Sequence, residues 1–305
     1  MRAGPRRLPW TPVQLVHCDD YLVPLPAGHP FPMGKYADLR GRLRTRDFAH
    51  IRAATPATRV ALVRAHDPVY VDTFLLGNVD PLAQRRLGFP WSEALVQRCL
   101  ASTGATLEAA FLALEYGTAG VLAGGTHHAH RDFGAGYCAF NDIAVAARAV
   151  LDAGRAARIL VIDVDVHQGD GTAAIFANDP AVFTLSLHGE RNFPARKAAS
   201  DLDVGLADGT TDRAYAQALD GALAEAFALQ RPDFVFVQGG VDPLGADHLG
   251  RLDLSLEGLL ERDRAVLRAA AGLPLVWTMG GGYSRPIDAT LAAHVASFTA
   301  LSDRP

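Results

Sequence analysis

The chain has 305 residues, 49% of them hydrophobic, which is enough for one large α/β domain or two small ones. Its 29 Lys and Arg against 33 Asp and Glu give a formal charge of −4, which argues against a general basic surface for nucleic acid or anionic lipid. Its three cysteines lack a C-x-x-C spacing, which argues against a disulfide framework and a thiolate zinc site. No apolar export or anchor segment follows Met1 to Trp10. We therefore expect a cytoplasmic protein without nucleic-acid or membrane partners.

The first part of the chain predicts scattered elements joined by Pro- and Gly-rich loops. In chain order we expect a strand at 13–17, a loop over 24–34, a helix at 35–46, a helix from Pro56 to about Arg64 capped by Thr55, and a helix from Ser92 to Glu115 ended by Gly117.

From residue 121 onward, strands and helices alternate. We expect strands at 121–123, 159–164, 182–187, 234–237 and 275–278, with helices at 144–153, 214–229 and 256–271. This alternation predicts a mostly parallel sheet with helices on both faces. No internal repeat or linker divides the chain, so we expect a single domain over 1–305 with its core at about 13–300.

An apolar run at 159–162 leads into Asp163, Asp165 and His167. Side chains alternate along a strand, so these three groups fall on one face. Two carboxylates and an imidazole are tolerated in a buried position only when a cation or several hydrogen bonds compensate. The segment predicts a metal-binding edge, with a solvated acidic turn as the alternative.

Three other predicted strands also end in polar or Gly-rich loops. These loops carry His127 and His128 after the strand at 121–123, Asp242 after 234–237, and Tyr283 after 275–278. Ligands of open α/β sheets bind outside the carboxyl ends of the strands. We therefore expect the four loops to converge on one site.

A catalytic zinc needs three protein ligands and an open position, which Asp165, His167 and Asp242 can supply. Fe(II) or Mn(II) is an alternative metal, because two of these three ligands are carboxylates, which bind through oxygen. Two imidazoles and two carboxylates are left after the metal ligands, and we expect them to pair, His127 with Asp163 and His128 with Asp170. In each pair the carboxylate would fix the tautomer of an imidazole that acts in acid–base catalysis.

Tyr283 follows three glycines, and its hydroxyl could stabilise an oxyanion across from the metal. An ordinary core tyrosine is the alternative.

Several of these motifs together resemble the zinc-dependent histone deacetylase and acetylpolyamine amidohydrolase superfamily. They are Gly125-Thr-His-His128, Gly136-Tyr-Cys-Ala-Phe-Asn-Asp142, Asp163-Val-Asp-Val-His-Gln-Gly-Asp-Gly171, Leu185-Ser-Leu-His188, Gly239-Gly-Val-Asp242 and Gly280-Gly-Gly-Tyr283. The similarity runs from about His17 to Arg285. His29-Pro-Phe-Pro-Met-Gly-Lys35 is most similar to the compact class IV branch and its bacterial lysine deacylase relatives.

The resemblance implies an arginase-like open α/β fold with an eight-stranded, mostly parallel sheet and one zinc per chain. It implies that His128 acts as general base and then acid, that His127 acts electrostatically, and that Tyr283 polarises the scissile carbonyl. It also implies a structural potassium ion near Asp163, Asp165, His167, Ser186 and Leu187.

The resemblance further implies a narrow acyl-lysine tunnel lined by Gly136, Tyr137, Phe193 and Leu249. One departure concerns the rim of this tunnel. Many family members clamp the substrate backbone with an Asp in an early loop, and the loop around Leu87 to Pro90 has none.

The expected function is removal of acyl groups from the ε-amine of acyl-lysine in a peptide or protein. An amidohydrolase for small acylamines or acetylpolyamines is the main alternative, although 305 residues leave no room for the large insertion of polyamine enzymes. A binuclear manganese ureohydrolase and a non-catalytic acyl-lysine-binding protein are weaker alternatives. The Ala- and Arg-rich composition is typical of a bacterial protein, and the oligomeric state stays open.

Overall fold

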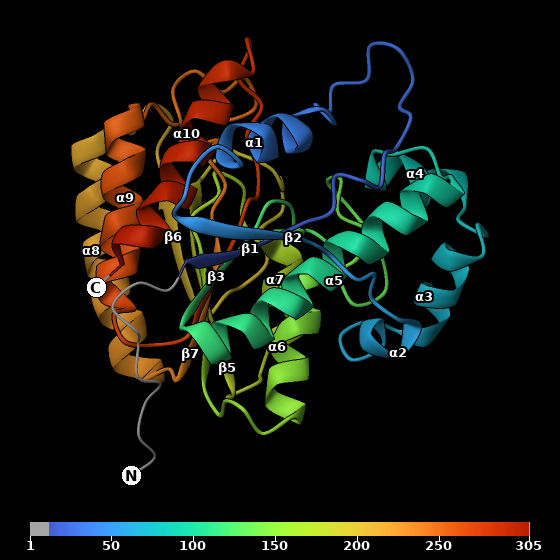
Figure 1. Ribbon diagram of the computed structural model, residues 1–305, viewed down its shortest axis with the longest axis horizontal. Helices are drawn as coiled ribbons and strands as arrows, with labels where there is room; N and C mark the ends of the chain where they lie inside the picture. The colour runs from blue at the N-terminus through green and yellow to red at the C-terminus, as the bar shows by residue number, and fades with distance from the viewer. Residues whose placement is uncertain (1–11, 305) are drawn as a thin grey trace.

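The computed structural model describes residues 12–304, so the expectation for Met1 to Trp10 falls outside the described residues. Its centre is a sheet of eight strands in the order β2-β1-β3-β8-β7-β4-β5-β6 (Figure 1). Every strand pair between neighbours is parallel. The predicted mostly parallel α/β sheet is therefore confirmed, and within the described chain it is parallel throughout.

The strands that carry the site lie in the middle of this sheet. The strands are β1 (Val13–His17), β2 (Ala49–Ala53), β3 (Thr118–Val121), β4 (Ile159–Asp163), β5 (Val182–Gly189), β6 (Leu202–Leu206), β7 (Phe234–Gln238) and β8 (Leu275–Thr278). Every residue of β3, β4, β7 and β8 is buried, as expected for parallel strands covered on both faces.

Helices cover both faces of the sheet. They are α1 (Lys35–Leu43), α2 (Arg59–Leu62), α3 (Pro68–Leu75), α4 (Pro81–Leu87), α5 (Glu93–Tyr116), α6 (Asp142–Asp152), α7 (Asp170–Phe176), α8 (Asp212–Gln230), α9 (Leu256–Ala269) and α10 (Asp288–Ala300). Helices α5 and α6 pack together on one side, and α8, α9 and α10 form the opposite layer (Figure 1). Side-chain caps at Ser92, Asn141 and Ser255 start α5, α6 and α9 by accepting backbone N–H groups.

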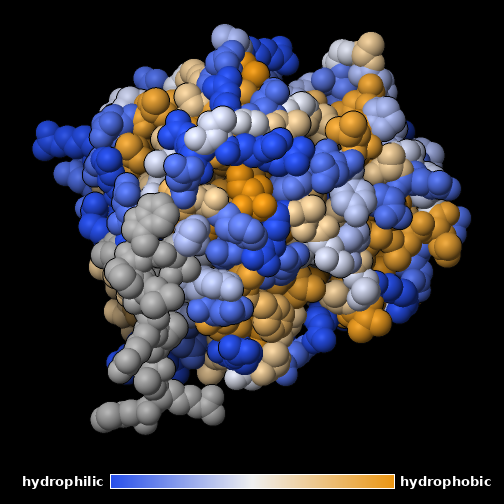
Figure 2. Space-filling model, viewed as in Figure 1, coloured by the Kyte–Doolittle hydropathy of each residue, from blue (hydrophilic) through white to orange (hydrophobic). Residues whose placement is uncertain are grey.

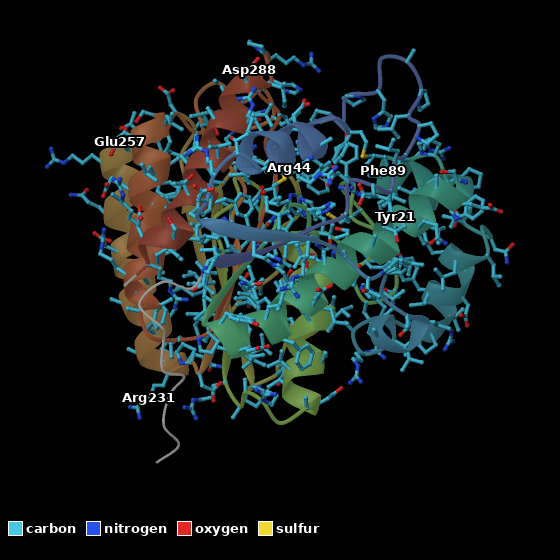
Figure 3. The ribbon with its side chains drawn as sticks, viewed as in Figure 1. Tyr21, Arg44, Phe89, Arg231, Glu257 and Asp288 are labelled. Atoms are coloured by element: carbon cyan, nitrogen blue, oxygen red, sulfur yellow. The ribbon has the colours of Figure 1, made fainter. Side chains whose placement is uncertain are left out.

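Helix α1 is tied to the last helix, α10. Asp288, labelled in Figure 3, begins α10, and its carboxylate accepts a 2.6 Å hydrogen bond from Arg42 of α1. Helix α1 therefore joins the layer of α8, α9 and α10 rather than that of α5.

The expected helix from Pro56 was wrong. Helix α2 begins at Arg59, and Thr58 caps it by accepting from the N–H of Ala61. The preceding segment is held against α5 instead, because the N–H of Ala57 donates to the carbonyl of Leu100. Tertiary contact with α5 therefore overrides the local Thr-Pro start signal.

The surface is polar over most of the face in Figure 2, with apolar side chains gathered over α2, α3 and α4. The exposed large side chains there are Val60, Val69, Leu76 and Leu82. Among residues 12–304, no helix has both the length and the apolar character to cross a bilayer.

Candidate active site

The predicted site residues meet at the carboxyl edge of the central strands. A cavity of about 460 Å³ opens there. The predicted residues on its wall are His127, His128, Gly136, Tyr137, Asp165, His167, Phe193, Leu249 and Tyr283. Asp163, Asp170 and Asp242 lie behind this wall, where they contact its imidazoles.

Asp165, His167 and Asp242 form a cluster whose ligand atoms all lie within 4.8 Å of one another. The Nδ1 atom of His167 is 3.0 Å from Asp165 Oδ1 and 3.1 Å from Asp242 Oδ2. Apart from this ion-pair contact with His167, the buried Asp242 Oδ2 makes no hydrogen bond, although the N–H of Val166 donates to the other oxygen. A buried carboxylate oxygen without a donor fits a cation ligand, so this donor set suits zinc.

Two glycines let the backbone pass close to these carboxylates. A Cβ at Gly240 would lie 2.0 Å from Asp165 Oδ2, and one at Gly281 would lie 2.0 Å from Asp242 Oδ2. The N–H of Gly281 also donates to Asp165 Oδ2 at 2.8 Å. The loops after β7 and β8 therefore pack closely against the two carboxylates, and the N–H of Gly281 holds that of Asp165.

Two histidine–aspartate pairs stand beside the cluster, with the partners expected from the sequence. His127 Nδ1 is 2.6 Å from Asp163, and His128 Nδ1 is 2.6 Å from Asp170. Because each Nδ1–H donates to a carboxylate, the Nε2 atom of each ring is directed away from that carboxylate.

The two imidazoles differ in charge. Burial lowers the pKa of His128 to about 4, and the neighbouring His127 charge adds to this effect. Burial also opposes the charge on His127, but Asp163 and Asp165 outweigh it and raise the pKa of His127 to about 9. These opposite shifts favour the neutral imidazole at His128 and the charged one at His127, and such divergence is typical of acid–base sites.

Sequence reasoning missed His130, which lies two residues after the pair. Its Nε2–H donates to Asp170 Oδ2 at 3.0 Å, so Asp170 accepts hydrogen bonds from two imidazoles, those of His128 and His130. Together these hydrogen bonds outweigh burial and hold the pKa of Asp170 below its usual range. The signal was present in the spacing His127-His128-Ala-His130.

Two side chains from other elements, Gln238 and Arg262, make hydrogen bonds around Asp165, and no local sequence pattern predicts them. Gln238 at the end of β7 donates to the carbonyl of Gly125 at 2.8 Å and to Asp165 at 3.3 Å. The buried Arg262 of α9 donates to the carbonyls of Val164 and Gly240. These groups hold the side chain of Asp165 and the backbone carbonyl that precedes it.

Tyr283 stands on the wall with its ring against a buried cation. Lys35 Nζ lies 4.7 Å from the centre of that ring and donates to the carbonyl of Gly282 at 3.2 Å. Burial lowers the pKa of Lys35 to about 8, and burial raises the pKa of Tyr283 well above its ordinary value. The phenol is therefore kept protonated, in the form that can donate a hydrogen bond.

The predicted tunnel residues surround the entrance to this cluster. Gly136 and Tyr137 both have positive φ, and the Phe193 ring meets His128 edge-on at 4.8 Å between centroids. Leu249 is 39% exposed at the opening. Cys138 lies beside them as a buried thiol, and burial raises its pKa well above the ordinary value, which disfavours the reactive thiolate.

The residues expected around potassium lie on β4 and β5 and in the turn after β4. Asp163 pairs in register with Ser186, and Asp163 Oδ1 accepts from the N–H of Asp165 at 3.2 Å. Burial raises the pKa of Asp163 to about 6. A further cation near this carboxylate would offset that burial.

A second acidic group, His17, Asp19 and Asp20, could also hold a metal by its ligand spacing. Arg40 already ion-pairs with Asp19 at 2.8 Å, so this group is a salt-bridge network at the end of β1.

Comparisons with known proteins agree with this geometry. Residues 29–299 match the sequence profile of the histone deacetylase domain. The chain is 43% identical over 294 residues to an uncharacterized protein of Picosynechococcus sp., covering 95% of this chain and 98% of the relative. It is 30% identical over 279 residues to histone deacetylase 2 of Arabidopsis thaliana, covering 84% of this chain and 70% of the relative.

Solved structures show the same fold. The crystal structure of an HDAC homolog complexed with SAHA superposes with a TM-score of 0.83 at 26% identity, covering 97% of this chain and 85% of the other. An HDAC homolog from Aquifex aeolicus gives a TM-score of 0.82 at 25% identity, with the same coverage of both chains. The chain therefore belongs to the histone deacetylase family and is a hydrolase that acts on amide bonds.

Proposed function

We propose that this protein is a zinc-dependent lysine deacylase, which removes an acyl group from the ε-amine of acyl-lysine in a peptide or protein. The observation that carries the proposal is the two hydrogen-bonded pairs, His127 with Asp163 and His128 with Asp170, beside a three-residue metal-ligand cluster at the wall of the cavity. When bound to this cluster, zinc would act as a Lewis acid and lower the pKa of water.

The side chains of the chain itself account for the proton transfers. His128 Nε2 accepts a proton from the water that attacks the carbonyl carbon, while Asp170 holds the opposite nitrogen. The hydroxyl of Tyr283 donates to the carbonyl oxygen as negative charge develops there, and the His127 cation stabilises the same charge. His128 then gives its proton to the leaving amine, the C–N bond breaks, and the acyl group leaves as a carboxylate.

Two further assignments belong to the proposal. A structural potassium ion would be held near Asp163, Asp165, His167, Ser186 and Leu187, which is supported by the buried Asp163 carboxylate. Its removal should lower the Tm, as measured in potassium against lithium buffer at equal ionic strength, and an equal Tm would argue against it. We also propose a cytoplasmic location, because Cys18, Cys99 and Cys138 are all free thiols.

The test is amide hydrolysis by zinc-loaded protein across acetyl-, butyryl-, octanoyl- and myristoyl-lysine peptides beside acetylputrescine. Turnover of lysine peptides is expected, and the preferred chain length would report the depth of the cavity. Tyr283→Phe is the control and should lose most of the turnover. Hydrolysis of acetylputrescine alone would instead assign a small-molecule amidohydrolase.

A further inference from the structure

The opening of the cavity is lined by arginines. Arg85 and Arg86 stand on α4, Arg191 follows β5, and Arg251 lies in the segment after β7. All four residues are exposed. Among the described residues, the one carboxylate that lines the same cavity is Asp165, which lies at its floor in the proposed metal cluster. We call these four arginines the rim.

The α4 side of the rim is attached to the tunnel wall. The carbonyl of Arg86 accepts from the N–H of Gly136 at 3.2 Å, and the carbonyl of Leu87 accepts from Tyr137 at 2.7 Å. The Arg86 guanidinium also lies 4.6 Å from the centre of the Phe133 ring. Phe89, labelled in Figure 3, follows α4 and packs its ring 5.1 Å from that of Tyr137. These contacts attach the end of α4 to the tunnel wall and hold the Arg86 charge beside the opening.

The opposite side of the rim is a shared ion pair. Arg191 and Arg251 both lie 3.3 Å from Asp208 Oδ2, with 72% and 51% of their side chains exposed. Asn192 joins the two segments by donating to the carbonyl of Leu249 at 2.8 Å. One carboxylate therefore forms ion pairs with two guanidinium groups, which leaves this side of the rim with a net positive charge.

Three carboxylates lie near the four rim arginines, Asp80, Asp208 and Asp247, so one positive charge of the four is left unmatched. Backbone N–H groups of α4 lower the pKa of Asp80 at its start, and the charges of Arg86 and Arg85 lower it further, so this carboxylate lies within their electrostatic range. Asp247 accepts from the backbone N–H groups of Tyr283, Leu249 and Gly250, which stabilise its negative charge without removing it.

The sign of the rim is opposite to that of the whole chain, whose formal charge is −4. A positive opening on a negative protein concentrates anions at that opening and repels cations. Arg85 and Arg86 directly precede the loop from Leu87 to Pro90, which contains no carboxylate.

We propose that the substrate carries a carboxylate close to the acylated amine, and that the rim arginines select it. The proposal rests on the proposed deacylase function and narrows its substrate class. Acidic side chains flanking an acyl-lysine in a peptide fit this opening, and an acetylated polyamine, whose remaining amines are cationic, does not. The α-carboxylate of a free acyl-lysine offers the same chemistry from a small molecule.

The test compares acetyl-lysine peptides of one length that carry Asp, Gln or Lys on both sides of the acylated residue. We expect kcat/KM to fall in that order by roughly tenfold from Asp to Lys, since several exposed ion pairs each contribute modestly. High salt should shrink the ratio, because exposed charges are screened. Free Nε-acetyl-lysine beside its α-amide separates a small-molecule source of the carboxylate from a peptide source.

Matched variants locate the effect. Arg191→Gln with Arg251→Gln, and separately Arg85→Gln with Arg86→Gln, should each reduce the Asp-to-Lys ratio. Arg213→Gln removes an exposed arginine on α8, away from the cavity lining, and should leave the ratio unchanged. A ratio near one in the parent protein, a preference for Lys, or a preference that survives in both rim variants would overturn the proposal.

A binding measurement separates this proposal from the deacylase function. The affinities of labelled Asp- and Lys-flanked peptides for the Tyr283→Phe variant are measured by fluorescence anisotropy. Tighter binding of the Asp peptide without turnover of any peptide by the parent protein would support the rim and refute the deacylase. Turnover of the Gln peptide with equal binding of the Asp and Lys peptides would do the reverse.

Discussion

Gly281→Ala tests how the glycine-rich loop supports the proposed metal ligands. The new methyl group would lie 2.0 Å from Asp242 Oδ2 and 2.7 Å from Asp165 Oδ2. To reach 3.4 Å, where ordinary contact begins, the Asp242 oxygen must move by about 1.4 Å. Zinc sites tolerate deviations of about 0.2 Å in ligand distance, so this shift removes or distorts one ligand. We expect zinc affinity to fall by at least about 10–100-fold.

The cost to folding should be much smaller than the cost to metal binding. Overpacking one methyl group destabilises a protein by about 1–3 kcal/mol, which urea unfolding of the metal-free protein will measure. Gly221→Ala is the control, because position 221 is exposed in α8 and nothing lies within 4 Å of its Cβ. That change should stabilise the protein by about 0.5–1 kcal/mol and leave zinc affinity intact. A Gly281→Ala protein that binds zinc with parental affinity would refute the reasoning.

Three more outcomes are expected. Tyr283→Phe should lower kcat by roughly 10²-fold as a lost oxyanion donor, and a kcat within threefold of the parent's would contradict that role. Asp170→Asn should reduce kcat while zinc content stays parental, because Asp170 orients His128 and His130 rather than the metal cluster; loss of zinc would contradict this. Burial lowers the pKa of His66 to about 4, so the unfolded chain binds more protons between pH 6.5 and 4. Stability should fall as pH drops through that window, by about 3 kcal/mol for this group; His66→Gln should show a shallower slope, and equal slopes would contradict the assignment.

The elements around the site could be predicted because their signals are local. Strands β4, β5, β7 and β8 are short apolar runs, and three of them end directly in Gly-rich or acidic turns. Parallel pairing then brings those turns to one edge without further information. The pairs His127–Asp163 and His128–Asp170 were predictable because two adjacent imidazoles and two carboxylates remain once the three proposed metal ligands are assigned.

The elements missed were those with weak or contrary local patterns. Strand β2 contains His50 and Arg52 and lies at the edge of the sheet, so its apolar run is broken. Strand β3 was expected at 121–123 but spans Thr118–Val121, because small residues there are buried by neighbours on both sides. Helices α3 and α4 begin with Asp67-Pro and Asp80-Pro, and a capping Asp followed by proline is a local signal for the start of a helix.

Other parts of the site depend on contacts between distant segments. Lys35 reaches Tyr283, Arg262 reaches Val164, and Gln238 reaches Gly125, and no spacing in the sequence links these residues. The rim shows the same limit, since its arginines come from three separate segments. These contacts are set by packing of the whole sheet and its helices.

The central claim is a mononuclear zinc hydrolase, and one titration tests it most directly. Zinc is added stepwise to metal-free protein while bound metal and hydrolysis of an acyl-lysine peptide are followed together. We expect activity to rise linearly with zinc, to reach its plateau at one equivalent, and to be absent in Asp242→Ala. Activity that needs two metal equivalents, or that is present before any metal is added, would contradict it.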